Sequence, residues 1–332
     1  FGDIRELVDY LRLRTGILAR RHSAPRANGR DEKRNLEKVV SPMSSSSLQL
    51  DVCALPGSQR LVTSGDFEVY YAWAPQAPNV MREIGRLREE TFRAVGEGTG
   101  RGIDLDHFDA NYFHLFIWHR TEHYIVGAYR IGHVDKLLVG SDQRALYTHT
   151  LYEYDRAFLE RVSPGLELGR SFVVARHQRE FQPLLLLWRG IATYVAQHPR
   201  YSKLFGAVSI SDRHDDVSKR LMLDHLSSYL DPELHALVRA RHPVPAPSPD
   251  SLPQWTKAMV ANMSEVSAMV AEIETDKRGV PVLLRDYLKL GGRLAGINVD
   301  PNFGHAITAL VVVDLRTTNH RLLSRYMGKA GE

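Results

Sequence analysis

Strand-like and helix-like patterns follow one another from residue 66 to residue 315, and their order constrains the fold of this chain more than any other feature. Residues 66–73 alternate apolar and polar side chains, as a half-buried strand does. Residues 79–95 then repeat apolar side chains at helical spacing. Two aromatic and β-branched runs, 112–118 and 123–131, flank a polar turn and predict an antiparallel hairpin.

The second half of the chain continues this order with further strands and helices. Residues 166–174 and 204–210 have strand patterns on either side of a helix that Pro183 opens, since proline is tolerated in the first helical turn. One mixed sheet with helices on both faces, an α/β (α+β) fold, is the economical packing of this order. The remaining patterns predict helices over 214–240, over 254–275 and from about Val280 to Gly291–Gly292, and then strands over 294–299 and 309–315.

The chain divides into three parts by composition. Residues 3–21 carry apolar side chains near helical spacing, so we expect a helical segment over 1–22. Residues 23–60 have little to bury and include prolines, mixed charges and a serine run, which is typical of a linker. Residues 61–329 form the main domain, with a helical insertion at about 214–278.

Apolar residues make up 43% of the chain and charged residues 25%, which predicts a packed core and argues against disorder. Cys53 is the sole cysteine, which excludes an internal disulfide and fits a reducing compartment, the cytoplasm. The longest apolar run, Leu184–Trp188, is far too short to cross a bilayer. Any membrane contact is therefore expected to be peripheral, at the inner membrane.

Basic residues gather in two stretches, although the formal net charge is only +4. Residues 1–40 hold ten Lys or Arg against six Asp or Glu, and residues 176–220 hold eight against four. Such stretches suit an acyl carrier protein, an anionic membrane surface or a nucleic acid, with a plain solvated surface as the alternative. No recognised nucleic-acid-binding motif accompanies them, so we expect no nucleic-acid partner.

Two opposite charges interrupt the apolar strand at 166–174. Burying Glu167 and Arg170 is costly unless the two are paired or used. Strict alternation sends them to opposite faces, but Gly169 is a natural place for a bulge that brings both to one side. We interpret them as a catalytic pair, with a structural ion pair as the alternative. Arg130 is a further charge in an apolar strand.

A basic turn follows this strand and leads into the helix that begins at Pro183. It contains Arg176 and Arg179, and the helix N-terminus offers unpaired amide groups and the positive end of a dipole. The combination suits an anion such as the phosphate of a phosphopantetheine arm. A solvated basic turn is the alternative.

The loop over residues 96–112 combines four glycines with Glu97, Asp104, Asp106 and Asp109. It does not match a Walker phosphate loop and lacks the full calcium-loop pattern, so we expect no metal here. Mobile glycines with carboxylates suit a lid over a cationic substrate. A plain capped turn is the alternative.

Five stretches of the main domain carry a family resemblance. They are Arg86–Phe92, Gly96–Gly100, Leu166–Val174, Leu187–Ile191 and Phe205–Ser211. Together they resemble the amino-acid-lipid N-acyltransferases that acylate ornithine or glycine, which are often labelled hemolysin-like and belong to the GNAT superfamily. The resemblance covers roughly residues 61–329, but the usual GNAT phosphate loop is altered, because residues 176–182 contain no glycine.

A more distant similarity is to the acyl-homoserine lactone synthases. It rests on the positions where that family has its Arg-x3-Phe, acidic, Arg and Glu-x-x-Arg signatures: Arg88 with Phe92, Asp106 with Asp109, Arg130, and Glu167 with Arg170. In both families the glutamate is a proposed general base and the arginines organise the site. The resemblance therefore implies that Glu167 takes a proton from the amine, with Arg170 beside it.

The resemblance also implies the fold and the activity. The fold is GNAT-like, a mixed central sheet flanked by helices on both faces. The reaction is transfer of a fatty acyl group, sometimes 3-hydroxylated, from an acyl carrier protein thioester to an amino acid such as ornithine or glycine. The product is a lyso-amino-acid lipid, the donor is acyl-ACP or acyl-CoA, and no cofactor is bound permanently.

The implied binding residues fall into two groups. Those for the amino-acid substrate are Arg88, Phe92, Glu97, Asp104, Asp106, Asp109 and Arg130. Those for the acyl carrier and its phosphopantetheine arm are Arg176, Arg179, Ser209 and Ser211.

Members of this family often carry the domain behind a lysophospholipid acyltransferase domain. The chain begins at Phe1 and has no His-x4-Asp pair, so the resemblance implies the C-terminal part of such a fusion. The rival interpretation is a non-catalytic module that binds acyl carrier protein or anionic membrane, but the charges within the strand at 166–174 favour an enzyme. The sequence leaves the acceptor, the acyl chain length and the oligomeric state open.

Overall fold

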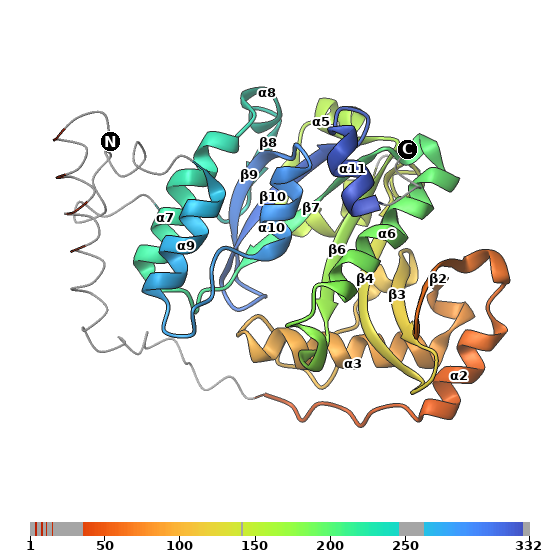
Figure 1. Ribbon diagram of the computed structural model, residues 1–332. Coiled ribbons are helices and arrows are strands. Elements are labelled where there is room, and N and C mark those ends of the chain that lie inside the picture. The colour runs from red at the N-terminus through yellow and green to blue at the C-terminus, as the bar shows by residue number, and fades with distance from the viewer. Residues whose placement is uncertain are drawn as a thin grey trace.

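The computed structural model describes residues 36–140, 142–245 and 262–327, together with residues 4, 8, 11 and 15 (Figure 1). The helical segment predicted over 1–22 lies outside the described residues except at those four positions. Among the described residues, no helix combines the length and the apolar character that crossing a membrane requires.

The described residues form one large mixed sheet, as the sequence predicts, with the strand order β1-β2-β3-β4-β6-β7-β10-β9. Neighbouring strands run antiparallel except for β6 and β7, which run parallel. The strands are β1 (Arg60–Ser64), β2 (Phe67–Trp73), β3 (Phe113–His119), β4 (Tyr124–His133), β6 (Gly165–Val173), β7 (Lys203–Ile210), β9 (Arg293–Asp300) and β10 (Ala306–Asp314).

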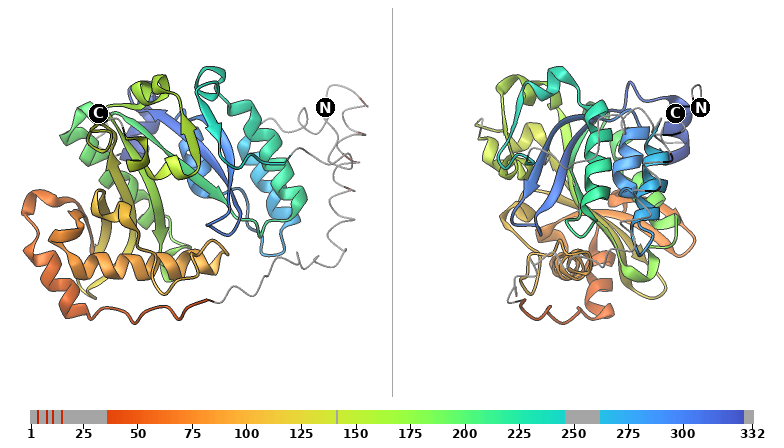
Figure 2. Two further views of the ribbon diagram at one scale, coloured as in Figure 1. Left: turned by 180° about the vertical axis from the view of Figure 1, so that it is seen from behind. Right: turned by 90° about the vertical axis from the view of Figure 1, so that its left-hand side faces the viewer.

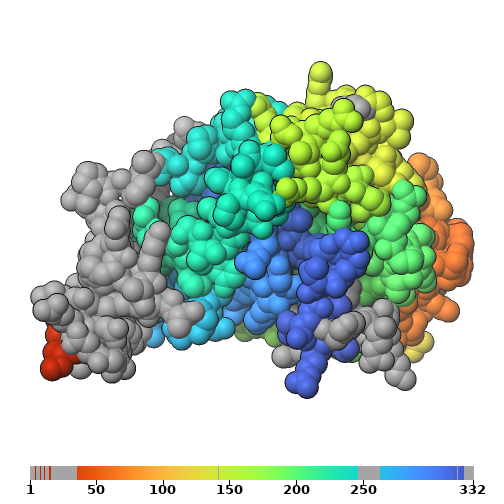
Figure 3. Space-filling view, turned by 90° about the horizontal axis from the view of Figure 1, so that it is seen from above, coloured from red at the N-terminus to blue at the C-terminus, as the bar shows by residue number. Residues whose placement is uncertain are grey.

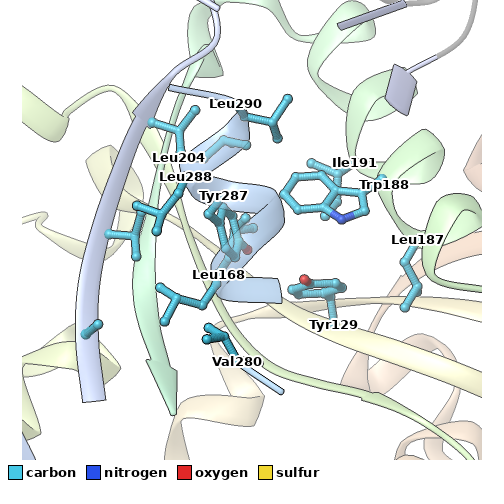
Figure 4. Close-up of a cluster of buried hydrophobic side chains, with 14 of the residues drawn as sticks. Tyr129, Leu168, Leu187, Trp188, Ile191, Leu204, Val280, Tyr287, Leu288 and Leu290 are labelled. Atoms are coloured by element: carbon cyan, nitrogen blue, oxygen red, sulfur yellow. The ribbon is translucent and has the colours of Figure 1, made fainter. Parts of the chain in front are cut away.

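One face of the sheet is covered by helix α6 and by the helices of the C-terminal half (Figure 1). Trp188 of α6 and Tyr287 of α10 meet edge to face, with ring centroids 5.0 Å apart, inside a cluster of buried apolar side chains (Figure 4). Gly190 lets α6 approach the sheet, because a Cβ there would lie 2.7 Å from Val69 Cγ1. The helices are α6 (Gln182–Gln197), α7 (Asp216–Leu226), α9 (Met263–Ile273), α10 (Val282–Lys289) and α11 (His320–Met327).

The other face carries two separate layers, which are visible from behind (Figure 2). Helices α2 (Ser45–Ala54) and α3 (Pro78–Ala94) pack over the β1–β4 half. The half that contains β6, β7, β10 and β9 is covered by smaller elements, whose two strands pair with each other. In the view from above, the yellow-green and teal surfaces of this part of the chain adjoin (Figure 3). These are α4 (Val134–Leu137), β5 (Tyr152–Tyr154), α5 (Arg156–Val162), α8 (Pro232–His235) and β8 (Val238–Ala240).

Helix α2 corrects the linker prediction for residues 36–60. Ser44 caps it, accepting a hydrogen bond from the Ser47 amide, and Leu48 and Val52 are buried beside α3. Asp51 then accepts hydrogen bonds from the Asn79 amide at 2.6 Å and from the Val80 amide, so it caps the N-terminus of α3. The serine run that resembles linker composition is therefore the start of a packed helix.

The helical insertion also differs from its prediction in part. Residues 214–240 do not form one helix, because α7 ends at Leu226 and Pro232 begins the short helix α8. Proline cannot donate an amide hydrogen bond and restricts the residue before it, so a continuous helix through this position is excluded. The chain then pairs as β8 with β5. Most of the proline-rich loop after it lies outside the described residues.

Candidate active site between strands β6 and β7

The parallel pair β6 and β7 is joined by α6 and is held together only at its start. Backbone pairing covers residues 165–167 against 203–205. Beyond it, residues 168–173 of β6 and 206–209 of β7 line a cavity of about 920 Å³. A cavity of this size holds small-molecule ligands, and peptide groups of strands that no longer pair can bond to such a ligand.

The cavity wall comes from both faces of the sheet. Tyr129 and Tyr287 line it on the side of α6 and α10, where Figure 4 shows both near Leu168. Phe92 of α3 and Tyr147 line it on the opposite side. The cavity therefore passes through the sheet at the point where β6 and β7 separate.

The predicted bulge in β6 is present. Gly169 pairs with Arg130 and Phe172 with Ala128, so Arg170 and Ser171 together oppose one residue of β4. Arg170 rather than Gly169 has left-handed backbone, with a φ of 50°. The extra residue brings Glu167 and Arg170 to the same side of the sheet, where both contact Tyr147.

Glu167 lies behind the cavity wall rather than in it. Its carboxylate accepts hydrogen bonds from the Tyr112 hydroxyl, from the Thr148 amide at 2.6 Å and from the Tyr147 amide at 3.2 Å. Complete burial raises its pKa. Its contacts hold the backbone at 147–148, and Glu167 is not among the residues that line the cavity, whereas Tyr147 is.

Arg170 does line the cavity, but its carboxylate partner is not Glu167. Its guanidinium donates to the Tyr147 hydroxyl at 3.2 Å and lies 3.3 Å from an Asp104 oxygen. It also lies over the ring of Phe303, 4.7 Å from the centroid. The structural ion pair considered as the alternative for Glu167 and Arg170 is not among the described ion pairs.

The aspartates of the loop after α3 pair with internal arginines and do not face the cavity, unlike the carboxylates of the predicted lid over a cationic substrate. Asp109 accepts from Arg88 at 2.8 Å, and Asp106 from Arg130 at 2.7 Å. Arg88 is 0% exposed and Arg130 1%, so these ion pairs neutralise charges that water cannot reach. The loop carboxylates therefore have internal partners, and Arg88, Arg130, Asp104, Asp106 and Asp109 do not line the cavity.

Buried Glu89, which the sequence interpretation did not select, fixes the glycine-rich part of the loop. Its carboxylate accepts from the Thr99 amide at 2.9 Å, from the Thr99 hydroxyl at 2.6 Å and from the Gly100 amide at 2.9 Å. Arg93 completes the contact as an ion pair at 2.7 Å. Glu89 precedes Glu90 on α3, and nothing in the sequence distinguishes the buried member of that pair from the exposed one.

Glu97 is the loop carboxyl group that reaches the cavity. It is 5% exposed and accepts a hydrogen bond from the Ser209 hydroxyl of β7 at 2.8 Å. Burial raises its pKa to about 7, while the Ser209 hydrogen bond and the Arg170 charge act in the opposite direction. Ser211 lines the cavity nearby and donates to the Val95 carbonyl at 2.7 Å.

The two arginines predicted to bind the acyl carrier lie in different places. Arg179 lines the cavity beside the start of α6. Arg176 instead lies over the ring of Tyr124 and pairs with Glu122 at 3.6 Å, at the end of the β3–β4 hairpin. Three further basic residues of the cavity wall, from the stretch around α10, were not predicted, because they are far from β6 in the sequence: Arg278, Arg285 and Lys289.

Comparison with known proteins identifies the domain. Residues 87–189 match a family described as an acetyltransferase (GNAT) domain. A glycine N(alpha)-acyltransferase of Bacteroides thetaiotaomicron is 27% identical over 288 residues, which cover 81% of this chain and 83% of the relative. A glycine N(alpha)-acyltransferase of Phocaeicola vulgatus is 24% identical over 282 residues, 81% of this chain and 86% of the relative.

A third relative has a different named substrate. The L-ornithine N(alpha)-acyltransferase of Agrobacterium fabrum is 25% identical over 259 residues, which cover 74% of this chain and 78% of that enzyme. No solved structure matches the chain with significance. The domain match runs from within α3 to within α6 and includes β6, which lines one side of the cavity, and the mixed sheet agrees with a GNAT fold. The chain is an acyltransferase that carries a GNAT domain and is homologous to bacterial N-acyltransferases of glycine and of ornithine.

Proposed function

We propose that this protein transfers a fatty acyl group from an acyl carrier protein thioester to the amine of an amino acid such as glycine or ornithine, giving a lyso-amino-acid lipid. The observation that carries the proposal is the cavity through the sheet between β6 and β7. It offers one continuous space in which a thioester and an amine can meet without a covalent enzyme intermediate. The names of the relatives support the choice of acceptor.

The donor side of the proposal rests on the basic residues of the cavity wall. Near the start of α6, Phe181 and Leu184 line the cavity, and four basic residues line it as well: Arg179, Arg278, Arg285 and Lys289. Cations and free amides at a helix N-terminus suit the phosphate of a phosphopantetheine arm. The apolar wall formed by Tyr129, Leu168 and Tyr287 suits the acyl chain that the arm delivers.

The acceptor side rests on the carboxyl groups of the same cavity. Glu97 and Asp300 line it, and Arg170 lies close enough to act on the charge of both. Carboxylates attract the ammonium group of an amino acid, while the arginine suits its carboxylate. Because the product is a lipid, we also propose that the protein works at an anionic membrane surface, bound peripherally.

The test is direct detection of amide formation. Purified protein is incubated with acyl carrier protein thioesters of several chain lengths, with the matching coenzyme A thioesters, and with a panel of amino acids that includes glycine and ornithine. We expect release of a free thiol and an N-acyl amino acid, detected by mass spectrometry. Turnover with the coenzyme A thioesters alone would identify coenzyme A as the donor.

The kinetic pattern and one control separate the alternatives. Transfer in a ternary complex gives intersecting double-reciprocal plots for the two substrates, and parallel plots would contradict it. Binding of acyl carrier protein or anionic vesicles without any thiol release or amide would support a non-catalytic binding module and overturn the proposal.

A further inference from the structure

We propose that Glu97, and not Glu167, is the residue that removes the proton from the acceptor amine. This inference rests on the proposed N-acyl transfer and adds the identity of its base. It starts from position, since a base must reach the proton that it removes, directly or through one water. Glu97 lines the cavity, whereas Glu167 does not line it and bonds instead to the backbone amides of Tyr147 and Thr148.

The surroundings of Glu97 fix its carboxyl group at the cavity edge. The Ser209 hydroxyl holds one oxygen at 2.8 Å from the side of β7. The turn between β9 and β10 presses on the preceding residue, because a Cβ on Gly304 would lie 2.0 Å from the Gly96 carbonyl oxygen. Phe303 of the same turn lines the cavity and packs on Phe92 of α3. The Ser209 hydrogen bond therefore holds the carboxyl group itself, and the β9–β10 turn packs against the backbone that carries it.

The hydrogen-bond partners of the two glutamates also favour Glu97 as the base. Glu167 accepts from one hydroxyl and two backbone amides, so three of its roughly four lone-pair sites are used in holding the chain. Glu97 accepts one hydroxyl hydrogen bond, and no ion pair reaches it within the described part of the chain. A carboxylate with free lone pairs facing a cavity can accept a proton without breaking structural contacts.

The charges around Glu97 suit a base that works near neutral pH. Burial raises its pKa to about 7, the Ser209 hydroxyl and Arg170 of β6 lower it, and Asp300 of β9 raises it. Arg213 packs against Gly96 and donates to the Ala94 carbonyl at 2.8 Å, so this cation is already held by the end of α3. A base is most effective when its pKa lies near the working pH.

The three protons of the acceptor ammonium group end in three different places during the transfer. The acceptor enters as an ammonium ion, and Glu97 takes one proton to give the neutral amine. The nitrogen attacks the thioester carbonyl carbon, so a C–N bond forms and the C–S bond breaks. The second proton leaves the nitrogen and ends on the departing thiolate as the free thiol. Glu97 then returns its proton to solvent, and the amide keeps the last N–H.

The test compares pH profiles of turnover. Wild-type kcat, at saturating thioester and acceptor, should rise with pH through a limb near 7, because Glu97 must lose its proton before it can act. Glu97→Gln should lower kcat by about 100-fold or more and abolish this limb, while KM for the thioester changes by less than about threefold. Glu97→Asp should keep the limb at reduced kcat.

The control is Glu90→Gln, the same chemical change on the exposed face of α3 and outside the cavity. It should keep both the wild-type kcat and the limb, and thermal unfolding shows that each variant is folded. A Glu97→Gln variant with the wild-type limb and kcat would overturn the assignment even though the wild type makes amide. Absence of amide from the wild type with every acceptor would instead remove the proposed function.

Discussion

Arg88 and Arg130 show how a charged side chain can be placed in a protein interior. Each is fully enclosed, and each depends on aspartates of the loop after α3. His114 completes the arrangement, because burial and the nearby Arg88 lower its pKa to about 3 and leave a neutral ring whose Nδ1 accepts from Arg88 at 3.0 Å. The network ties α3 to β3 and β4 directly behind the cavity.

Removing the Arg88 side chain tests the contribution of this network to stability. Arg88→Ala should reduce the free energy of unfolding by about 3 kcal/mol or more, because it leaves the Asp109 carboxylate with a buried partner missing. Urea denaturation followed by circular dichroism measures the change. Arg60→Ala, which removes a half-exposed pair with Glu68, is the control and should cost less than about 1 kcal/mol. Equal losses for the two variants would contradict the structural role of Arg88.

At the scale of the elements, the close approach of β6 and β7 determines where the cavity begins. A Cβ on Gly206 would lie 2.1 Å from the Leu168 carbonyl oxygen, so the strands touch here without side chains between them. The cavity starts directly after this contact. A glycine at this position of β7 therefore sets the separation of the strands.

Adding a methyl group at Gly206 tests this contact. Gly206→Ala should move β7 away from β6, lower the free energy of unfolding by about 1–3 kcal/mol and raise KM for the thioester. Gly57→Ala is the matched control, because Gly57 lies outside the cavity and a Cβ there meets no atom within 4 Å. Thermal unfolding and initial rates measure both variants. Gly206→Ala with wild-type stability and KM would show that the strands tolerate separation.

Elements with strong periodicity could be predicted from the sequence, whereas those defined by tertiary contacts could not. The amphipathic pattern of α3 and the hairpin of β3 and β4 are confirmed within a few residues. Helix α2 was missed because its serines are used at the cap and its buried face is only Leu48, Asp51 and Val52. The strand β8 was missed because its partner, β5, is distant in the sequence.

The sequence indicated which charged residues come together, but it did not indicate how they are arranged. The charges of the 166–174 strand and of the loop after α3 do come together around Tyr147. The sequence could not show which carboxyl group faces the cavity, because that depends on where α3 ends relative to β7. Glu97, predicted to bind substrate, lines the cavity, whereas Glu167, predicted to be the catalytic base, does not.

For the whole molecule, a buried carboxyl group in the cavity makes stability depend on pH. The pKa of Glu97 is about 7 in the folded protein and near its ordinary 4.5 in the unfolded chain. Between these values the folded state holds a proton that the unfolded state releases, so stability falls as pH rises from about 4.5 to about 7. Above about pH 7 the carboxyl group is ionised in both the folded and the unfolded state, so the free energy of unfolding stays lowered by the same amount.

Replacing Glu97 with glutamine should remove this dependence of stability on pH. Glu97→Gln should be more stable than the wild type at pH 8, by up to about 3 kcal/mol, and close to it at pH 5, because the amide never ionises. Differential scanning calorimetry at the two pH values provides the measurement, with Glu90→Gln on the exposed face of α3 as the control. Identical curves for Glu97→Gln and the wild type at both pH values would refute the prediction.

The passage of the cavity through the sheet has one more consequence. In the proposed reaction, an amide formed at the gap between β6 and β7 would join an acyl chain on one side of the sheet to an amino-acid head group on the other. Such a product would extend through the sheet, with one part on each face. Release of the proposed product would then require one of its ends to pass through the opening between β6 and β7 before the next turnover.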